Sequence, residues 1–352
     1  MKVMVTSLRF NIVHTQHLIA WGQMLTGAGY EAALFVDSGF NKHLEGCGTK
    51  IINTFEEAKS FAPDVIVAYS SASKNLKLVK TFKGKAKLFF TLHEPYCGLK
   101  DFLIGTAKFI ITRAIPRNIL DRIVCANVDA VILPSEKAKI SYQNHTKHWN
   151  KNFTTFPLLF PDLYKTEYNQ IKREYFSYIG NWGNRHGKDN YLKTVKYIYD
   201  NKLDIKCKIA TRYNINEELQ EPHLKEMIKS GQLVVFQGRD MTLEEINNHF
   251  LQAAAVWLVY TVSQQSGVLG TAFMMGAPAI VSNVGSFKEY VKDGYNGHYI
   301  NNTEDFAEIT EKFNLIKNNA EYFSKNARQT FKDKYSPNSQ ANRFEKMIEA
   351  KY

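Results

Sequence analysis

The chain has 352 residues, of which 44% are hydrophobic and 13% aromatic, and because one hydrophobic core rarely grows beyond about 300 residues, we expect two domains. Its four cysteines are scattered without a CxxC pair, which argues against a disulfide framework or a zinc site and favours a reducing compartment. No apolar run approaches the roughly 18 residues of a membrane-spanning helix, and the first residues lack a signal-peptide pattern. The composition therefore predicts a cytoplasmic protein of two domains.

The positive charge is concentrated in one half of the chain. The formal net charge is +11, and residues 1–165 hold 21 Lys and Arg against 12 Asp and Glu, whereas residues 166–352 hold 24 against 22. A basic half suggests an anionic partner: a phospholipid surface, a lipid-linked phosphate acceptor or nucleic acid. An ordinary solvated surface rich in lysine explains the same excess equally well.

The first half alternates strand-like and helix-like patterns. Residues 2–6 form a short β-rich run, and residues 17–28 carry apolar side chains at helical spacing before Gly29. Further strands are expected at residues 30–36, 64–69, 87–92 and 130–133. Strands that alternate with helices predict a parallel α/β sheet.

Residues 98–124 combine an apolar stripe with basic side chains, and Pro116 predicts a break into two helices. The flanking cations are Lys100, Lys108, Arg113, Arg117 and Arg122. Basic amphipathic segments can lie on anionic membrane surfaces, which predicts a peripheral contact with the inner face of the plasma membrane. A buried helix with ordinary surface lysines gives the same pattern.

The second half repeats the α/β plan. Strands are expected at residues 175–179, 206–210, 233–236, 256–260 and 279–281, with helices at 190–201, 243–253 and 267–275. Residues 320–351 form two helices broken at Ser336-Pro337. We therefore predict two doubly wound domains, 1–165 and 166–330, and a C-terminal helix over 331–352 that packs back toward the first domain.

The segment over residues 263–300 carries most of the chemistry. A turn of small residues, Ser266-Gly267, opens a helix, and Gly276-Ala277-Pro278 precedes a buried strand. The first N–H groups of a helix lack partners within the helix, and its dipole favours negative charge there, which suits a diphosphate.

In order and spacing this segment resembles the donor-binding segment of family 4 glycosyltransferases. The matching features are Gly267-Val268, Gly276-Ala277-Pro278, Val284-Gly285-Ser286, Glu289 and the run Asp293-Gly294-Tyr295-Asn296-Gly297. The QSGV version is similar to that of enzymes from capsule, O-antigen and exopolysaccharide clusters. The resemblance implies a GT-B fold, in which two Rossmann-like domains face each other across a cleft, and a retaining, metal-independent transfer from a nucleotide sugar.

A second segment, residues 176–192, is similar to the loop that neutralises the donor diphosphate in that family. There Gly180 lets the backbone approach the ligand, while Arg185, His186 and Lys188 supply positive charge and hydrogen bonds. His186 departs from the pattern, because lysine is usual at its position.

The resemblance assigns the remaining donor contacts to two regions. Ser266, Gly267 and Val268 would hold the diphosphate, and Gly238 and Arg239, which follow a strand, would contact the base or a phosphate. The family usually carries two glutamates here. Thr271 stands at the second position, and Ser263 or Gln264 at the first, so Thr271 offers only one hydroxyl to the donor ribose.

In the first half, His93 and Glu94 follow an apolar strand, and the resemblance implies that they face the donor sugar as the catalytic pair. Arg9, Asn11 and His14 in the first loop are acceptor-side candidates.

The hypothesis is transfer of a hexose from a UDP- or GDP-linked donor, without cofactor or metal, to a lipid-linked or polysaccharide acceptor in bacterial surface glycan synthesis. A catalytically weak subunit that binds sugar nucleotides is the first alternative, because the glutamate pair is missing. A basic nucleic-acid-binding protein is the second, although no C₂H₂ spacing or RRM signature supports it, and no nucleic-acid partner is expected. No GxGxxG follows either first strand, which argues against a nicotinamide-dependent enzyme.

Overall fold

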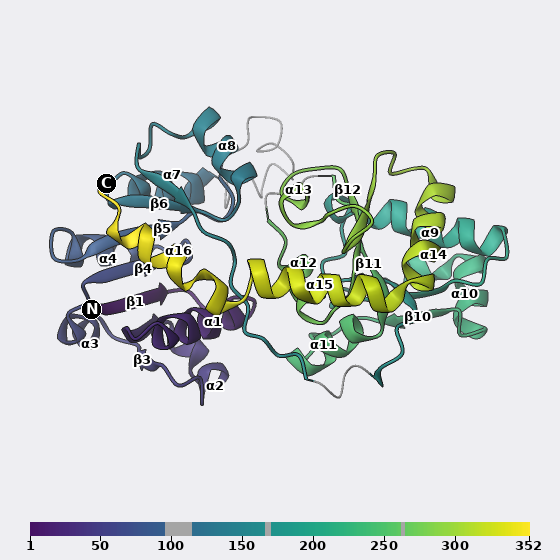
Figure 1. The fold of residues 1–352 in the computed structure, drawn as a ribbon, viewed down its shortest axis with the longest axis horizontal. Coiled ribbons are helices and arrows are strands. Elements are labelled where there is room, and N and C mark those ends of the chain that lie inside the picture. The colour runs from purple at the N-terminus through teal and green to yellow at the C-terminus, as the bar shows by residue number, and fades with distance from the viewer. Residues whose placement is uncertain (96–114, 166–169, 262–264) are drawn as a thin grey trace. The chain divides into compact units, whose positions relative to one another are not determined.

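The computed structural model describes residues 1–95, 115–165, 170–261 and 265–352. The chain forms two compact units, the first made of Met1–Pro161 with Lys334–Tyr352 and the second of Asp162–Asp333 (Figure 1). The boundaries expected from the sequence were 165/166 and 330/331. The last helix belongs to the first unit.

The first unit contains a parallel sheet in the order β3-β2-β1-β4-β5-β6-β7. Its strands are β1 (Lys2–Ser7), β2 (Glu31–Val36), β3 (Lys50–Ile52), β4 (Val65–Ala68), β5 (Lys87–Thr91), β6 (Ala130–Leu133) and β7 (Phe153–Thr155). The strand order reverses between β1 and β4, which makes that boundary the topological switch point of the sheet. The sequence predicted the inner strands and missed the three-residue edge strands β3 and β7.

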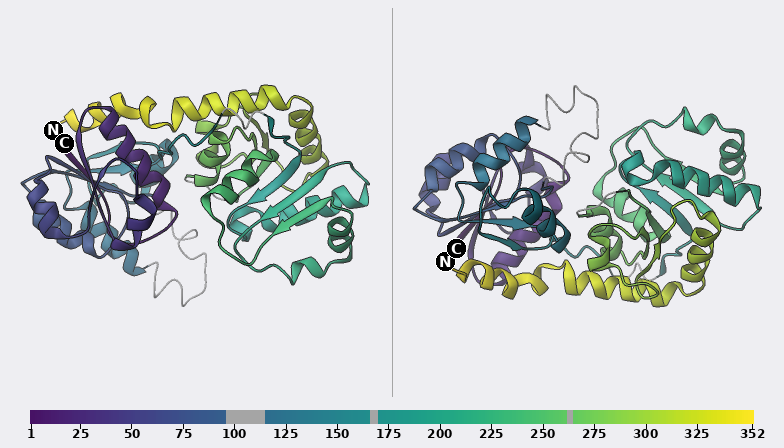
Figure 2. Two further views of the ribbon diagram at one scale, coloured as in Figure 1. Left: turned by 90° about the horizontal axis from the view of Figure 1, so that it is seen from below. Right: turned by 90° about the horizontal axis from the view of Figure 1, so that it is seen from above.

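Helices cover both faces of this sheet (Figure 2). They are α1 (His14–Gly27), α2 (Asn41–Leu44), α3 (Phe55–Phe61), α4 (Lys74–Phe82), α7 (Ile115–Cys125), α8 (Glu136–His145) and α16 (Pro337–Glu349). Strands covered on both faces are apolar throughout, as VIVA in β4 and AVIL in β6 illustrate. Of the amphipathic stretch 98–124, residues 98–114, with Lys100, Lys108 and Arg113, lie outside the described part.

The C-terminal helix α16 is held against α1 by aromatic side chains. The ring of Trp21 lies 5.0 Å from that of Phe156 and 5.6 Å from that of Phe344. Lys87 Nζ donates hydrogen bonds to the carbonyl oxygens of Ile348 and Ala350 at the end of α16. These contacts explain why the end of the chain belongs to the first unit.

The second unit contains a parallel sheet in the order β10-β9-β8-β11-β12-β13, with its switch point between β8 and β11. Its strands are β8 (Tyr175–Ile179), β9 (Lys206–Ala210), β10 (Leu233–Phe236), β11 (Ala253–Leu258), β12 (Ala279–Ser282) and β13 (Gly297–Ile300). Its helices are α9 (Lys188–Asp200), α10 (Pro222–Lys229), α11 (Leu243–Leu251), α12 (Gly267–Met274), α13 (Phe287–Tyr290), α14 (Phe306–Asn318) and α15 (Ala320–Lys334). The two doubly wound parallel sheets confirm the predicted fold class.

Two expected boundaries were wrong. The helix expected over 243–253 ends at Leu251, and β11 begins at Ala253 rather than at residue 256. Alanine favours helices, but Ala253, Ala254 and Ala255 are fully buried in the central strand, where packing overrides propensity. Helix α1 begins at His14, three residues earlier than expected from the apolar spacing, and its N-cap residue Val13 makes no capping side-chain hydrogen bond.

None of the helices formed by the described residues combines the length and apolarity needed to cross a bilayer.

Candidate functional site

In the second unit, the loop after β8 packs directly against the first turn of α12. Gly180 has a φ of +119°, which favours glycine, and a Cβ added there would lie 3.4 Å from Cγ2 of Val268. This contact joins two segments that lie far apart in the sequence. Both predicted donor segments therefore meet at the switch point between β8 and β11, where α/β sheets bind ligands.

Gly187 fixes the basic loop against the end of β11. It has a φ of +73° and precedes the first residue of α9, and a Cβ added there would lie only 2.1 Å from the carbonyl oxygen of Val259. The backbone N–H of Thr261 donates to the carbonyl oxygen of Arg185 at 3.1 Å, and the His186 ring packs edge-on against Tyr260 at 4.8 Å. The backbone of the loop is thus held on both sides of Arg185.

Ser266 caps α12, because its hydroxyl oxygen accepts a hydrogen bond from the backbone N–H of Leu269 at 3.2 Å. The same side chain is hydrogen-bonded to Tyr260, whose pKa is raised by burial. Tyr260 therefore stays neutral and links the N-terminus of α12 to the His186 ring. Residues 263 and 264 lie outside the described part of the chain.

The two cations of this loop differ in their surroundings. Arg185 is exposed and forms no ion pair with a residue that the structure describes. Lys188 Nζ lies 3.1 Å from Oε1 of Glu218, which also accepts a hydrogen bond from Nε1 of Trp182 at 3.0 Å. Partial burial disfavours the charged form of Glu218, but these hydrogen bonds outweigh it and lower the pKa of the carboxyl group. Much of the charge of Lys188 is therefore neutralised within the protein.

Thr271 is buried, and its hydroxyl donates a hydrogen bond to the carbonyl oxygen of Gly267 at 3.0 Å. That carbonyl lies one helical turn earlier in the same helix. Only the acceptor lone pairs of the hydroxyl remain for a ligand.

Gly238 and Arg239 lie at the end of the edge strand β10, which β9 separates from β8. Arg239 forms a two-pronged ion pair with Glu245 and covers the ring of Phe236 at 4.4 Å. The N–H of Gly238 donates to the carbonyl oxygen of Tyr213. The structure thus gives both residues partners within the second unit and places them away from the switch point.

The DGYNG run forms a tight structural turn before β13. Oδ1 of Asp293 accepts a hydrogen bond from the backbone N–H of Tyr299 at 2.9 Å, and the side chain of Asn296 donates to Tyr290 O and Thr330 Oγ1. A Cβ added to Gly297 would lie 2.2 Å from the carbonyl oxygen of Ala279. This part of the resembling segment therefore builds the fold of the second unit.

In the first unit, His93 and His14 lie together at the switch point between β1 and β4. Their rings stack with centroids 6.1 Å apart, and Nε2 of His93 lies 2.6 Å from the carbonyl oxygen of Tyr69, to which it donates. The side chain of Asn11 lies 3.3 Å from His14 Nε2, and Ser7 Oγ lies 3.3 Å from His14 Nδ1. Two predicted acceptor-side residues thus adjoin the predicted catalytic histidine.

Three members of this cluster were not predicted from the sequence: His17, Tyr69 and Ser70. Nδ1 of His17 donates to the carbonyl oxygen of Leu159 at 2.7 Å, the ring of Tyr69 contacts the imidazoles of His14, His17 and His93, and Ser70 Oγ bonds Ser7 Oγ at 3.0 Å. Tyr69 and Ser70 follow β4, and His17 lies in the first turn of α1. These positions at the carboxyl edge of the sheet could have indicated that the three residues belong to the site.

Both histidines of α1 are held neutral. Burial lowers the pKa of His14 to about 3, with added repulsion from His93. Burial likewise lowers the pKa of His17 to about 4, although its hydrogen bond to Leu159 opposes the shift. Neither imidazole titrates near neutral pH, so this cluster offers hydrogen bonds rather than a strong base.

Glu94 is exposed and turns toward α7, where Oε2 lies 3.5 Å from Nη1 of Arg117. Arg117 also pairs with the buried Asp121 at 3.6 Å. Arg9 is exposed beside the large apolar side chains of Phe10, Ile12 and Val13, which are exposed as well. Glu94 and Arg9 therefore do not join the cluster of histidines.

Within the described ranges, no group of three His, Cys, Asp or Glu side chains is arranged to hold a metal ion.

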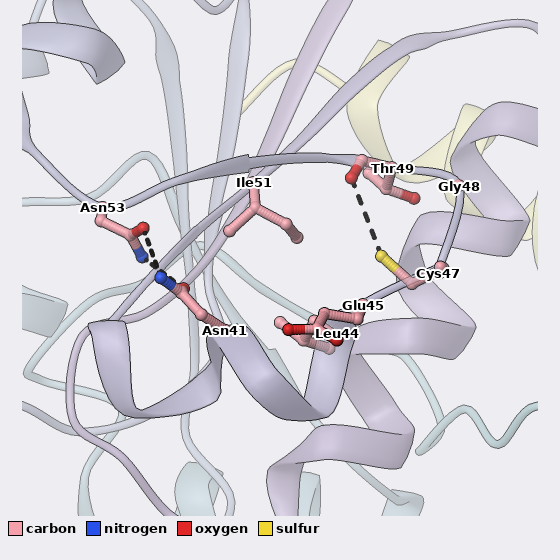
Figure 3. Close-up of a pocket in the computed structure, with 9 residues that line it drawn as sticks. Asn41, Leu44, Glu45, Cys47, Gly48, Thr49, Ile51 and Asn53 are labelled. Carbon is pink, nitrogen blue, oxygen red and sulfur yellow. Dashed lines mark hydrogen bonds between the residues drawn. The ribbon is translucent and has the colours of Figure 1, made fainter.

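A pocket of about 510 Å³ lies beside the edge strand β3 of the first unit (Figure 3). Asn41 and Asn53 join their side-chain amides across it, and the thiol of Cys47 donates to the carbonyl oxygen of Thr49 at 3.7 Å. Since β3 is two strands from β1, this pocket is separate from the switch point.

Part of the chain matches a known protein family. Residues 173–314 match the family model of "Glycosyl transferases group 1". No curated protein sequence matches the chain.

Solved structures with the same fold cover nearly the whole chain. Sucrose-phosphate synthase from Thermosynechococcus elongatus shares 13% identity with a TM-score of 0.69, covering 99% of this chain and 98% of that one. A glycosyltransferase from Rickettsia africae shares 12% identity with a TM-score of 0.66, covering 98% and 97%. Anabaena HepE, solved in complex with UDP, shares 12% identity with a TM-score of 0.66, covering 99% of each chain. Together, the matched family segment and the shared fold support a GT-B glycosyltransferase.

Proposed function

We propose that the chain transfers a hexose from a UDP- or GDP-linked donor to a lipid-linked or polysaccharide acceptor in surface glycan synthesis. The observation that carries the proposal is the packing of Gly180 against Val268, because it unites the basic loop and the start of α12. The basic loop, which carries Arg185 and leads into α9 at Lys188, then adjoins the N-terminus of α12. Backbone N–H groups and cations in this arrangement suit a diphosphate leaving group.

Retention without a metal is part of the proposal. In a front-face mechanism the leaving phosphate itself accepts the proton of the acceptor hydroxyl, so the protein needs no strong base. The first-unit cluster supports this, since His14 and His17 have a lowered pKa and Glu94 is ion-paired. In this scheme His93 and His14 hydrogen-bond hydroxyl groups of the sugar, and Arg185 and Lys188 stabilise the charge that develops on the diphosphate.

The ligands of a related solved structure favour a uridine donor. Anabaena HepE was solved with UDP, with UDP-glucose, and with UDP and glucose. We extend that donor class to this chain and propose that it acts in the cytoplasm, at the inner face of the plasma membrane.

The test is release of nucleoside diphosphate from a panel of UDP- and GDP-sugars in the presence of a lipid-linked glycan acceptor. The double variant Arg185→Gln/Lys188→Gln is expected to lose turnover. Lys193→Gln is the matched control, because Lys193 lies on α9 and, like Lys188, pairs with a glutamate, Glu304. Equal turnover in the double variant and the control would remove the donor-site assignment. NMR of the product tests retention at the anomeric carbon, and turnover in EDTA tests metal independence.

A second candidate is a sugar-nucleotide-binding subunit with little turnover. The observation that favours it is Thr271, which replaces a glutamate and donates its hydroxyl hydrogen to Gly267. Calorimetric binding of UDP-sugars without product formation would select this candidate. Turnover that rises in Thr271→Glu would instead show that the lost carboxylate limits an existing transferase.

A further inference from the structure

Helix α7 exposes a stripe of isoleucines along one side. Ile115, Ile119 and Ile123 are 40%, 54% and 44% exposed, and their spacing of four residues places them in a row on the helix. Asp121 and Val124 are buried on the opposite side, against the body of the unit. Branched apolar side chains at this exposure cost solvation free energy unless a partner covers them.

Helix α4 lies beside α7 and continues the same surface. Lys83, directly after α4, donates a hydrogen bond from Nζ to Oδ1 of Asn127 at 2.9 Å, and Asn127 bonds back to the carbonyl oxygen of Ile123. On α4, Leu76 is 42% exposed, and Lys80 follows it four residues later on the same side. The two helices are therefore neighbours, and each exposes apolar side chains.

The charges on this surface have one sign. Lys80, Lys83 and Arg122 are exposed, and none forms an ion pair with a residue in the described ranges. Helix α4 contains no acidic residue, and the acidic residue of α7, Asp121, is buried and paired with Arg117. These three cations lie beside the apolar row, and the exposed carboxylate at its start, Glu94, is paired with Arg117.

We propose that this α4–α7 surface binds the anionic face of a phospholipid bilayer. It is made of Leu76, Ile115, Ile119 and Ile123 with Lys80, Lys83 and Arg122. The isoleucines insert between lipid headgroups while the cations meet their phosphates. A second copy of the chain fits less well, because a two-fold contact would oppose like charges. Nucleic acid offers phosphates but no apolar layer for the isoleucines.

The surface begins beside the predicted acceptor side of the first unit. Arg117 in the first turn of α7 pairs with Glu94, which directly follows His93. A bilayer on the α4–α7 surface would bring the carboxyl edge of the sheet near lipid headgroups, where a lipid-linked acceptor resides. The membrane contact itself requires neither donor nor turnover, so its test is independent of the proposed transfer.

The experiment is co-sedimentation of the full chain with vesicles of phosphatidylcholine alone or with roughly one third phosphatidylglycerol, at two salt concentrations. The wild type is expected to pellet with the anionic vesicles and to be released by salt. Lys80→Gln/Lys83→Gln/Arg122→Gln should lower the partition coefficient about fivefold for each charge removed. Ile119→Asn/Ile123→Asn should lower it at least about tenfold, even at low salt.

Helix α10 of the second unit supplies matched controls, since it also carries an exposed isoleucine between lysines. Lys225→Gln/Lys229→Gln and Ile228→Asn should pellet like the wild type. Unchanged thermal unfolding would show that the α4 and α7 variants keep their fold. Vesicle binding that is absent in the wild type, or that falls equally in the α10 controls, would overturn the proposal.

Discussion

The switch points of the two sheets have opposite chemical character. In the first unit, the imidazoles of His14 and His93 and a buried pair of serine hydroxyls gather at the strand ends. In the second unit, cationic side chains accompany a backbone shaped by Gly180 and Gly187. The same parallel-sheet plan thus supplies neutral hydrogen-bonding groups for hydroxyls in one place and positive charge for phosphates in the other. Side-chain hydrogen bonds hold the histidine cluster of the first unit in place, whereas the backbone conformation of two glycines fixes the basic loop of the second unit.

The largest effect is expected from Gly187→Ala, which disturbs the loop backbone at the switch point of the second sheet. The new Cβ would meet the carbonyl oxygen of Val259 at 2.1 Å, and the φ of +73° is unfavourable for alanine. We expect a loss of about 3 kcal/mol or more in the free energy of unfolding, together with loss of UDP binding. Urea denaturation and calorimetry measure both quantities.

Gly231→Ala is the control for that variant. Gly231 has a similar φ of +76° but nothing within 4 Å of an added Cβ, so only the conformational cost of about 1–2 kcal/mol remains. If both variants lost the same stability, the close approach at Gly187 would not be what fixes the loop.

Next in size is Lys188→Gln, which removes a cation and leaves Glu218 without its ion-pair partner. We expect the affinity for UDP to fall about 100-fold, because attraction is lost and the carboxylate is left to repel the phosphates. Arg185→Gln, which removes a cation without an ion pair among the described residues, should cost about tenfold.

The double variant Lys188→Gln/Glu218→Gln separates these two contributions. Removing both charges should restore part of the affinity for UDP that Lys188→Gln loses. Isothermal titration calorimetry with UDP measures the affinity of Lys188→Gln, Arg185→Gln and the double variant. No restoration would mean that Glu218 does not act on the bound phosphates.

The neutral histidines of the first unit predict a pH dependence of stability. Their pKa values in the folded state, about 3 for His14 and about 4 for His17, lie below the value of 6.5 in the unfolded chain. The unfolded state therefore binds more protons below pH 6.5, and stability is lost as the pH falls from there toward 4 and 3. The slope of unfolding free energy against pH should decrease by up to about 1.4 kcal/mol per pH unit in His14→Gln.

Thermal unfolding from pH 4.5 to 7 checks this, with His148→Gln as the control outside the cluster. His148 is exposed and follows α8. A wild-type melting temperature that stays constant over that range would contradict the neutral cluster.

The sequence predicted the fold class because alternating apolar strands and helical spacing are local signals. It missed β3 and β7 because three residues carry too little pattern to be recognised alone, and β13 because its sequence, GHYI, is not an apolar run. It placed the start of β11 too late, since buried alanines look helical until the sheet around them is known.

Candidate site residues that belong to a sequence motif were predicted. Residues that join the site only through contacts with distant parts of the chain were not. Gly180, Arg185, Lys188 and the Ser266 turn were found from their order along the chain. Glu218, which neutralises Lys188, lies 30 residues away in a three-residue 3₁₀ helix with no recognisable pattern. Likewise, the position of Tyr69 after a strand indicates that it lies at the carboxyl edge of the sheet, but not that three histidine rings contact it.

The smallest expected effect belongs to Arg239→Gln, at the edge of the second sheet. Because Arg239 is exposed and its ion pair with Glu245 lies in solvent, we expect the melting temperature to change little. The pair lies at the end of β10, and β9 separates β10 from the switch point between β8 and β11. UDP affinity should therefore change less than about threefold. A tenfold loss measured by calorimetry would instead support the predicted contact with the base or a phosphate. It would also mean that donor binding recruits Arg239 from its ion pair, and that the donor-binding region reaches from β8 to the edge strand.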